Sequence, residues 1–382
     1  MRLLHTITGL NIGGAEIMLT RFLRHLETAS YASSVLSLLP FGALRSQIAK
    51  TCADVYSIEM SRKPWPSDLY QLGRVMGRIK PDVIHGWMYH GNLAATLGSL
   101  VCRALAPVIW SVHHSIADIT DETPANRRLI QLSGRISSGT SAIVYCSRVA
   151  AEQHEAIGFD PRRTLVIPNG IDCNEFQIDA SASARLRTEL AIPTGRTIVG
   201  HVSRFHPMKD QANLVRALAR LIGEGYDIQG VFVGEGHIDG TVRTLARELG
   251  IDQRITTIGP RADVSDYLAG FDLFALSSAW GESFSLATAE AMSCGVPAVV
   301  TGLGDCGQLV GKTGLVVPPR DTEALARGIA SLVDLSQDER HSLGLSARRR
   351  VEQHFSIDNY VARHLELYQR VVEAQSSTAR LA

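Results

Sequence analysis

The sequence has no excess of charge of either sign. Lysine plus arginine and aspartate plus glutamate each number 38, so the formal net charge at pH 7 is zero. Proteins that bind nucleic acid broadly carry a basic excess, because lysine and arginine must neutralise the phosphates. The balance therefore argues against nucleic acid as a partner.

A long uninterrupted apolar run is also missing. The longest mostly apolar region, residues 91–110, contains Arg103, whereas a membrane-spanning helix needs about 20 consecutive, predominantly apolar residues. The first residues run directly into a strand-like segment, without the pattern of a signal peptide. These absences predict a cytoplasmic protein.

The cysteines form no CxxC pair, and no HExxH or similar spacing of metal ligands occurs. His85 and His90 alone are a weak indication of a metal. We therefore expect no metal and no cofactor, and we interpret the cysteines as reduced thiols, most of them buried. The six are Cys52, Cys102, Cys146, Cys173, Cys294 and Cys306.

Strand-like and helix-like segments alternate along the whole chain, which is the pattern of parallel α/β domains. With 382 residues, the chain is long enough for two domains, since a single core rarely grows beyond about 250–300 residues. The strands of the first half are expected at 3–8, 33–38, 55–58, 83–85, 107–112, 142–146 and 164–168. Those of the second half are expected at 197–203, 229–234, 255–259, 271–276, 298–301 and 314–317.

The polar stretch 171–184 lacks apolar periodicity and marks the seam between the halves. We predict an N-terminal Rossmann-like domain over residues 1–172 and a C-terminal Rossmann-like domain over 173–355. Residues 356–382 are expected to contain a long terminal helix, 356–380. The apolar face of this helix is expected from Phe355, Tyr360, Leu365 and Tyr368.

Two carboxylates frame the most informative segment, residues 280–297. Glu282 lies in a polar turn after a buried strand, and Glu290 lies in the helix that follows and stops near Gly295. A helix N-terminus has unpaired N–H groups and a partial positive charge, which suit a phosphate. A carboxylate one or two turns further accepts hydrogen bonds from sugar hydroxyls, so the combination indicates a nucleotide-sugar. The alternative is that Glu282 caps the helix and Glu290 is a solvated helix residue.

Two further loops follow strand ends, where ligands bind in open α/β sheets. Gly13 and Gly14 would let the backbone approach a phosphate, or they form an ordinary tight turn. Arg204 and Lys209 would suit a diphosphate, or they are solvated surface cations.

The strand at 107–112 ends in two adjacent histidines, His113 and His114. Side chains alternate along a strand, so only one of the two can readily face a shared cleft. The alternative is a structural histidine whose hydrogen bonds are satisfied within the protein.

A locally basic stretch in the first half is opposed only by Asp68. It is compatible with contact with an anionic membrane surface, and the alternative is a solvated helix face. Its members are Arg62, Lys63, Trp65, Arg74, Arg78 and Lys80.

The order of these segments resembles the retaining glycosyltransferases of family 4, and the resemblance covers essentially the whole chain. Their GT-B fold has two Rossmann-like parallel-sheet domains facing a central cleft. Each motif is weak alone, but their joint order and spacing are specific. The motifs are Gly13-Gly14-Ala15-Glu16, Ser111-Val112-His113, Pro168-Asn169-Gly170-Ile171-Asp172, Arg204 with Lys209, Gly234-Glu235-Gly236, Glu282 with Glu290, and residues 311–319.

The resemblance implies that the second domain binds a nucleotide-sugar donor and the first domain an acceptor. Arg204 and Lys209 would hold the donor diphosphate, together with backbone N–H groups around Phe284-Ser285-Leu286. Gly13 and Gly14 would approach the same phosphates from the first domain, and the last helix would cross back to that domain. No metal would be needed, because side-chain cations and a helix dipole offset the phosphate charge.

The resemblance also implies roles at the sugar. Glu290 would bind ribose hydroxyls, Glu282 would bind hydroxyls of the transferred sugar, and His113 would lie near the reacting carbon. In a front-face reaction the departing phosphate accepts the acceptor's proton, so Glu282 would position the sugar rather than attack it. Family members often have glycine at the places of Ser283 and Ser285, where serine adds a side chain and restricts φ. This difference predicts a narrower pocket or additional hydroxyl contacts.

We therefore predict a hexosyl-type glycosyltransferase that acts on a glycan or lipid-linked acceptor of a cell-surface polysaccharide, exopolysaccharide or lipopolysaccharide, at the inner face of the cell membrane. A nucleotide-sugar epimerase or hydrolase of the same fold is one alternative, and it would consume donor without acceptor. A non-catalytic nucleotide-sugar-binding partner is the other. Candidate residues for an acceptor pocket are Trp87, Tyr89 and His90.

Overall fold

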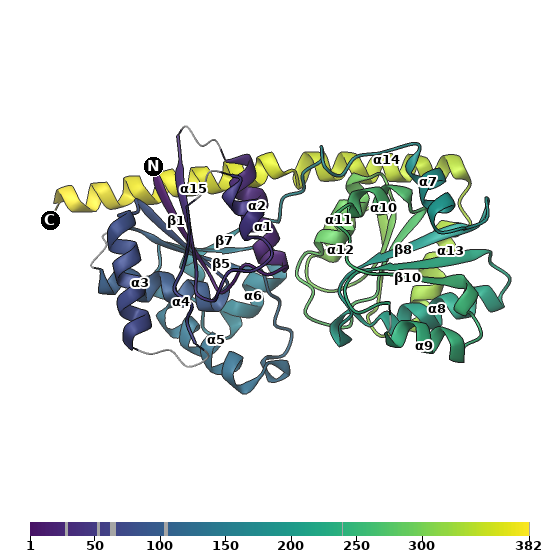
Figure 1. Cartoon of the computed structure of the whole chain (residues 1–382), viewed down its shortest axis with the longest axis horizontal. Helices are drawn as coiled ribbons and strands as arrows, with labels where there is room; N and C mark the ends of the chain where they lie inside the picture. Colours follow the sequence, from purple (N-terminus) through teal and green to yellow (C-terminus); the bar gives the residue numbers. More distant parts are fainter. Residues whose placement is uncertain (27–29, 52–53, 62–65, 103–105, 239, 382) are drawn as a thin grey trace. The chain divides into compact units, whose positions relative to one another are not determined.

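The computed structural model describes the chain except for residues 27–29, 52–53, 62–65, 103–105, 239 and 382. The chain folds into two compact units (Figure 1). Unit 1 comprises Met1–Gly170 and Ile357–Ala382, and unit 2 comprises Ile171–Ser356. Five residues named above lie outside the described part: Cys52, Arg62, Lys63, Trp65 and Arg103.

Unit 1 is built on a parallel sheet of seven strands in the order β3-β2-β1-β4-β5-β6-β7. Each strand begins and ends within two residues of its predicted position. The order reverses between β1 and β4, and ligands of open α/β sheets bind at such a reversal. The strands are β1 Arg2–Ile7, β2 Ala32–Ser37, β3 Asp54–Ser57, β4 Val83–Trp87, β5 Val108–Val112, β6 Ala142–Tyr145 and β7 Thr164–Val166.

Helices cover both faces of this sheet, and the alternation along each strand decides which residue meets which helix. Leu4 and Ile84 belong to the apolar cluster shared with α3 and α4. Their neighbours His5 and His85 contact rings of α1 and α15 instead. The helices are α1 Gly14–His25, α2 Arg45–Ala49, α3 Pro66–Ile79, α4 Met88–Val101, α5 Pro124–Ile136, α6 Arg148–Ala156 and α15 Ile357–Leu381.

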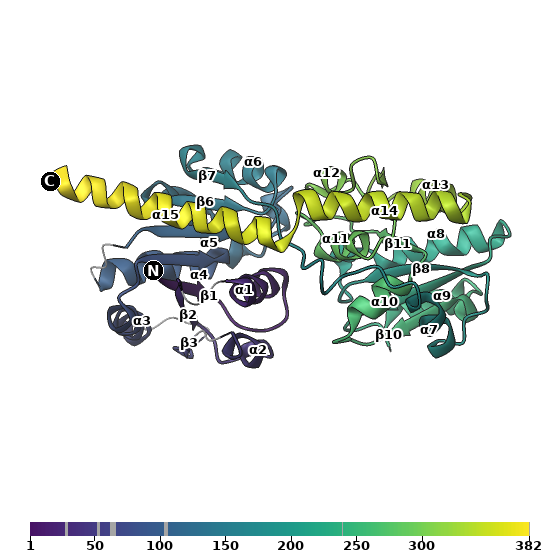
Figure 2. The ribbon, with the colours of Figure 1, turned by 90° about the horizontal axis from the view of Figure 1, so that it is seen from above.

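The terminal helix α15 lies over the sheet of unit 1, beside α1 (Figure 2). Its buried residues are spaced three or four apart, as expected for one helix face. Two residues predicted for this face differ in the structure: Leu365 is only partly buried, and Phe355 packs against Phe284 in the core of unit 2. The stripe consists of Ile357, Tyr360, Val361, His364, Leu367, Tyr368 and Val371.

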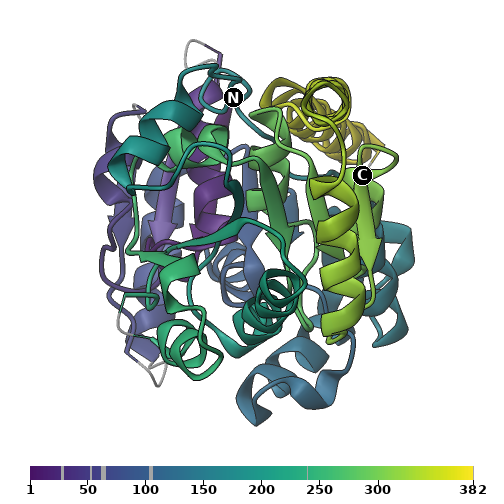
Figure 3. The ribbon, with the colours of Figure 1, turned by 90° about the vertical axis from the view of Figure 1, so that its right-hand side faces the viewer.

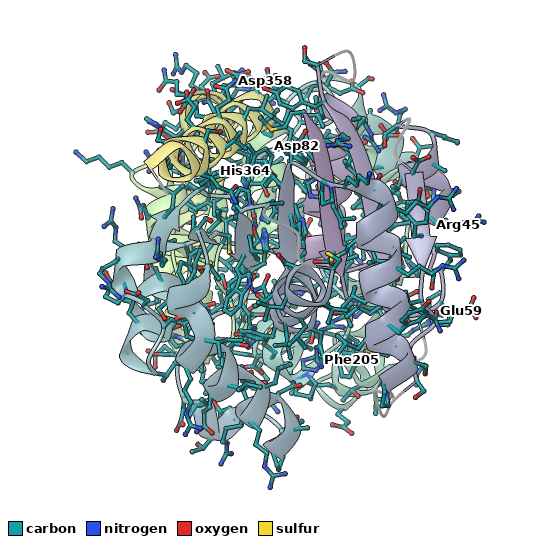
Figure 4. All side chains as sticks on the ribbon, turned by 90° about the vertical axis from the view of Figure 1, so that its left-hand side faces the viewer. Arg45, Glu59, Asp82, Phe205, Asp358 and His364 are labelled. Atoms are coloured by element: carbon teal, nitrogen blue, oxygen red, sulfur yellow. The ribbon has the colours of Figure 1, made fainter. Side chains whose placement is uncertain are left out.

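Neutral polar side chains hold α15 against the sheet. His364 projects from α15 toward the strands (Figure 4), and its ring stacks on that of His85. His85 Nδ1 lies 2.7 Å from the Tyr368 hydroxyl oxygen, and its Nε2 lies 2.6 Å from the Ser111 hydroxyl oxygen. Burial lowers the pKa of His5 and that of His364 to about 3, so both are uncharged at neutral pH.

Unit 2 has a parallel sheet of six strands in the order β10-β9-β8-β11-β12-β13. Their bounds again lie within two residues of the predicted ones. The order reverses between β8 and β11, which places the loops after these two strands at the expected ligand-binding edge. The strands are β8 Thr197–Val202, β9 Ile228–Val233, β10 Ile255–Ile258, β11 Leu273–Leu276, β12 Ala298–Thr301 and β13 Gly314–Val317.

Two apolar layers sandwich the sheet of unit 2. Phe274 and Leu276 of β11 pack into the layer that includes α11, whereas Leu273 and Ala275 pack into the layer of α8 and α13. In Figure 3, α13 (yellow-green) lies alongside the strands. The helices are α7 Ala182–Glu189, α8 Gln211–Gly223, α9 Thr241–Glu248, α10 Val264–Gly270, α11 Leu286–Ser293, α12 Cys306–Val310, α13 Thr322–Val333 and α14 Gln337–His354.

Candidate functional site

The loop after β8, residues 203–210, is held by His201 of β8, whose Nε2 lies 2.8 Å from the Ser203 hydroxyl oxygen, and by Gln211, the first residue of α8. His201 is buried, and burial lowers its pKa to about 3, so one ring nitrogen donates and the other accepts. Nδ1 lies 2.8 Å from the Ala275 carbonyl oxygen of β11 and therefore donates to it. Gln211 donates to the Ser203 hydroxyl oxygen and to the Arg204 carbonyl oxygen. The backbone at Arg204 is thus fixed, while its side chain is exposed.

Lys209 and Glu282 form a largely buried ion pair. Lys209 Nζ lies 2.5 Å from Glu282 Oε2, and the two side chains are 16% and 9% exposed. The Ser278 hydroxyl donates to the same carboxylate oxygen at 2.7 Å. The Ser277 hydroxyl donates to the Lys209 carbonyl oxygen at 2.8 Å, which ties the two loops together. Two residues predicted to contact different parts of a donor therefore contact each other.

Helix α11 begins at the end of this loop with Ser285 as its N-cap. The Ser285 hydroxyl accepts from the Thr288 N–H and lies 2.8 Å from Thr288 Oγ1. Its φ of +58° is in the left-handed region, which costs a residue other than glycine about 1–2 kcal/mol. A glycine would adopt this φ without strain, and the N-cap hydrogen bond of Ser285 offsets the strain here.

Ser283 and Phe284, the predicted donor-binding residues just before Ser285, are both buried. Ser283 is buried, and its Oγ has no hydrogen-bond partner within the described residues. Phe284 is a core residue that packs edge-on against Phe355, so only its backbone is available to a ligand. Gly304 packs directly against the loop that carries Glu282, since a Cβ at position 304 would lie 2.3 Å from the Glu282 carbonyl oxygen. A side chain at position 304 would therefore displace the loop that carries Glu282.

Glu290 lies in the second turn of α11 and is buried. Its backbone carbonyl accepts the N–H of Cys294, which ends the helix. Burial, followed by the nearby Glu290 carboxylate, raises the pKa of Cys294 to about 12. That thiol is therefore protonated at neutral pH and packs as a core residue.

A pocket of about 330 Å³ opens beyond β9 and β10, at the same sheet edge. The motif Gly234-Glu235-Gly236 contributes Gly236 to its lining, but a motif alone does not indicate a cavity. The pocket is lined by Gly236, Ile238, Gly240, Gly259 and Pro260.

In unit 1, Gly13 is the N-cap of α1 and Gly14 is its first residue. Gly13 has no side chain with which to cap this helix, so the first N–H groups receive no hydrogen bond from the side chain of the N-cap residue. A Cβ on Gly13 would lie 2.4 Å from a carboxylate oxygen of Glu16, whereas one on Gly14 would meet open space. The turn predicted between strand and helix is present, and its role toward phosphate stays a prediction.

His113 and His114 follow β5 and have different partners. His113 Nδ1 lies 3.1 Å from Asn169 Oδ1, and its ring stacks on Trp87 at 8° with centroids 5.4 Å apart. Burial lowers the pKa of His113 to about 4, although the Asn169 hydrogen bond raises it. His114 Nε2 lies 2.7 Å from Glu122 Oε1. The sequence analysis names Asn169 in a motif but does not predict its contact with His113, because the two residues are separated by 56 positions.

The candidate acceptor residues differ in exposure. Trp87 is fully buried under the His113 ring, so it cannot contact an acceptor directly. Tyr89 is also buried, and its hydroxyl lies 2.7 Å from His154 Nε2. His90, near the start of α4, is the exposed residue of the three, although partial burial still lowers its pKa.

The surface of α3 and the end of α4 combine basic and apolar side chains. Arg74 and Arg78 of α3 and the following Lys80 are exposed. Among the described residues, no helix has both the length and the apolar character to cross a membrane. The exposed apolar residues of these two helices are Leu69, Tyr70, Leu97, Leu100 and Val101.

Comparison with known proteins places both halves of the chain. Residues 12–175 match the family model described as "Glycosyltransferase Family 4", and residues 196–334 match "Glycosyl transferases group 1". The N-acetyl-alpha-D-glucosaminyl L-malate synthase of Bacillus anthracis is 25% identical over 378 residues, covering 95% of each chain. The D-inositol 3-phosphate glycosyltransferase of Mycobacterium tuberculosis (strain F11) is 33% identical over 304 residues, which span 76% of this chain and 62% of that one.

The fold also has a close counterpart among solved structures. HepE of Anabaena, crystallised with UDP-glucose, superimposes with a TM-score of 0.81 at 22% sequence identity, over 99% of this chain and all of the other. At that identity the likeness concerns the fold, and it confirms the predicted architecture of two Rossmann-like parallel sheets.

Proposed function

Because the chain belongs to the family 4, group 1 glycosyltransferases, retaining enzymes of GT-B fold that use nucleotide-sugar donors, we propose the following finer function. The protein transfers a hexosyl residue from the donor to a glycan or lipid-linked acceptor during synthesis of a cell-surface polysaccharide, exopolysaccharide or lipopolysaccharide. The observation that carries the proposal is the Lys209–Glu282 pair at the β8–β11 reversal, beside the N-terminus of α11.

We propose that the donor diphosphate binds at this edge of unit 2. The exposed Arg204 and the ammonium of Lys209 would offset its charge, and the first N–H groups of α11 would donate to its oxygens. With these groups in place the reaction needs no metal. Glu290 would accept hydrogen bonds from the ribose, and the unpartnered Ser283 hydroxyl would donate to the donor.

We propose that the nucleotide base binds in the pocket beyond β9 and β10. Glycines line much of this pocket, so the edges of the backbone are accessible to hydrogen-bond with a planar ring. Its position at the carboxyl edge of the same sheet as Lys209 supports one continuous donor site.

The residues of unit 1 have proposed roles in the same reaction. The N–H groups at Gly13 and Gly14 would donate to phosphate, and His113 would accept a hydrogen bond from a hydroxyl of the transferred sugar. An uncharged His113 suits this role, because an imidazolium has no acceptor nitrogen.

We propose that transfer occurs on one face of the sugar. The bond from the anomeric carbon to the phosphate oxygen breaks, the acceptor oxygen bonds to that carbon from the same face, and the acceptor's proton passes to the departing phosphate oxygen. Glu282 is held by Lys209 and Ser278, which suits a positioning residue better than an attacking carboxylate. Retention then needs no covalent intermediate.

We propose that unit 1 touches the cytoplasmic face of an anionic membrane through α3 and the end of α4. The exposed Arg74, Arg78 and Lys80 would attract acidic headgroups, and nearby Tyr70 and Leu100 would enter the interface. Such contact would bring the enzyme to a lipid-linked acceptor.

Nucleotide-sugars are expected to stabilise the purified protein without added metal. A donor at about 100 times its dissociation constant adds about 2.7 kcal/mol, which raises Tm by a few degrees for a chain of this size. The measurement is thermal unfolding against a panel of UDP-, GDP- and ADP-sugars, followed by transfer assays with membrane extracts as acceptor. Donor loss without acceptor would favour an epimerase or hydrolase, and binding without transfer would favour a non-catalytic partner.

Glu290→Ala and His113→Ala are expected to separate binding from turnover. Removing Glu290 should raise the dissociation constant of the nucleotide about tenfold, since it deletes hydrogen bonds between a carboxylate and ribose. Removing His113 should lower kcat with little change in nucleotide affinity. Calorimetric titration with the nucleoside diphosphate and steady-state kinetics measure the two effects, and equal losses of affinity in both variants would contradict the assignment.

A further inference from the structure

Asn169 is a buried polar residue next to the turn at which the chain leaves unit 1. Its side chain is 5% exposed, and its Oδ1 faces Nδ1 of His113 at 3.1 Å. The proposed reaction assigns no role to Asn169. Its placement bears on which nitrogen of His113 carries the proton.

The chemistry of the two side chains decides the tautomer. An uncharged imidazole has a single N–H, and an amide oxygen can only accept. Nδ1 of His113 must therefore carry the proton and donate to Asn169, which leaves the lone pair on Nε2. The stacked Trp87 indole fixes the plane of the ring.

Among the described residues, the titratable groups that interact electrostatically with His113 carry no charge at neutral pH. Those groups are His85 of β4 and His364 of α15, and burial lowers the pKa of both, so they are uncharged at neutral pH. The next residue shows the contrast. His114 faces the Glu122 carboxylate at 2.7 Å, and this hydrogen bond lowers the pKa of Glu122.

We propose that Asn169 is a positioning residue that holds His113 in the Nδ1–H tautomer and so keeps Nε2 as a hydrogen-bond acceptor toward substrate. The substrate part rests on the proposed glycosyl transfer, whereas the tautomer is a property of unit 1 alone. A neutral amide is the suitable partner, because a carboxylate at the same place would favour the imidazolium. The imidazolium has no acceptor nitrogen.

The direct test is the tautomer of His113 in the full chain labelled with ¹⁵N-histidine, without any ligand. Two-bond ¹H–¹⁵N spectra distinguish the two tautomers from the imidazolium, and His113→Ala assigns the signal. The wild type is expected to show the Nδ1–H form at neutral pH. Asn169→Asp is expected to show the imidazolium there, and Asn169→Ala a mixture of tautomers.

Kinetics give the second readout. Asn169→Asp should have a kcat/KM about tenfold or more below wild type at about pH 6. The sign follows from a raised His113 pKa: the acceptor is lost while the ring is protonated and returns as the pH rises through that pKa. The gap to wild type should therefore narrow toward about pH 9, because the deprotonated ring still donates Nδ1–H to the carboxylate.

Glu122→Gln is the matched control, since it alters the partner of the adjacent His114 and should leave the His113 signal unchanged. A wild-type His113 in the Nε2–H form would overturn the proposal, and so would an Asn169→Asp signal and pH profile like those of the wild type. The expected spectra without transfer from any donor would reject the proposed function while supporting the tautomer assignment. Thermal unfolding of each variant verifies that it is folded.

Discussion

Replacing Arg204 with alanine is expected to lower kcat/KM by about two to three orders of magnitude, or about 2–4 kcal/mol of transition-state stabilisation. Charge accumulates on the diphosphate as the glycosidic bond breaks, and Arg204 is the exposed cation on the loop beyond β8. Its backbone is held independently by Gln211, so the loop should keep its shape in the variant. Steady-state kinetics with the donor found by thermal unfolding measure the loss.

The stability of the Arg204→Ala variant should stay within about 0.5 kcal/mol of wild type, since the side chain is exposed and forms no ion pair within the described part of the chain. Arg204→Lys should lie between alanine and wild type, because it keeps the charge and loses the bidentate fork. Arg216→Ala, at an exposed position on α8, is the control for removing an arginine from this unit. Near-normal turnover in Arg204→Ala would remove this residue from the donor site.

The strands could be predicted closely because each is a short apolar run bounded by polar or turn residues. Apolar pattern also located the terminal helix, but it misjudged part of the buried face. Phe355 precedes α15 and packs in unit 2, and His364 is a polar residue that the buried stripe nevertheless includes. A pattern of apolar residues cannot predict that a histidine will be buried among aromatic rings, where burial keeps it uncharged.

The contacts within the candidate site could not be predicted from the sequence, for a different reason. Lys209 and Glu282 are 73 positions apart, and they meet because β8 and β11 are neighbours in the sheet. Motif spacing identified both residues as site candidates without indicating that they pair. The positive φ of Ser285 is likewise set by the loop that leads into α11. Their roles toward a donor stay predictions until the variants are measured.

Lys209→Ala is expected to reduce both activity and stability. The variant leaves the 9% exposed carboxylate of Glu282 with Ser278 but without its cation. Removing one partner of a buried pair typically costs about 3–5 kcal/mol, and the diphosphate also loses a cation. We expect the free energy of unfolding to fall by an amount of that order, measured by denaturant titration, and kcat/KM to fall about a hundredfold or more. Arg220→Ala, in the exposed Arg220–Glu224 pair, should leave the free energy of unfolding nearly unchanged, because solvent screens an exposed ion pair.

The double variant Lys209→Ala/Glu282→Gln separates the two effects. With both charges gone, no uncompensated carboxylate remains buried, so most of the lost stability should return. Activity should stay low, because the diphosphate still lacks the ammonium and the sugar lacks the carboxylate. Recovery of stability without activity therefore supports a donor-binding pair. If activity returns together with stability, the pair serves only to join the two loops, and the diphosphate depends on Arg204 and α11 alone.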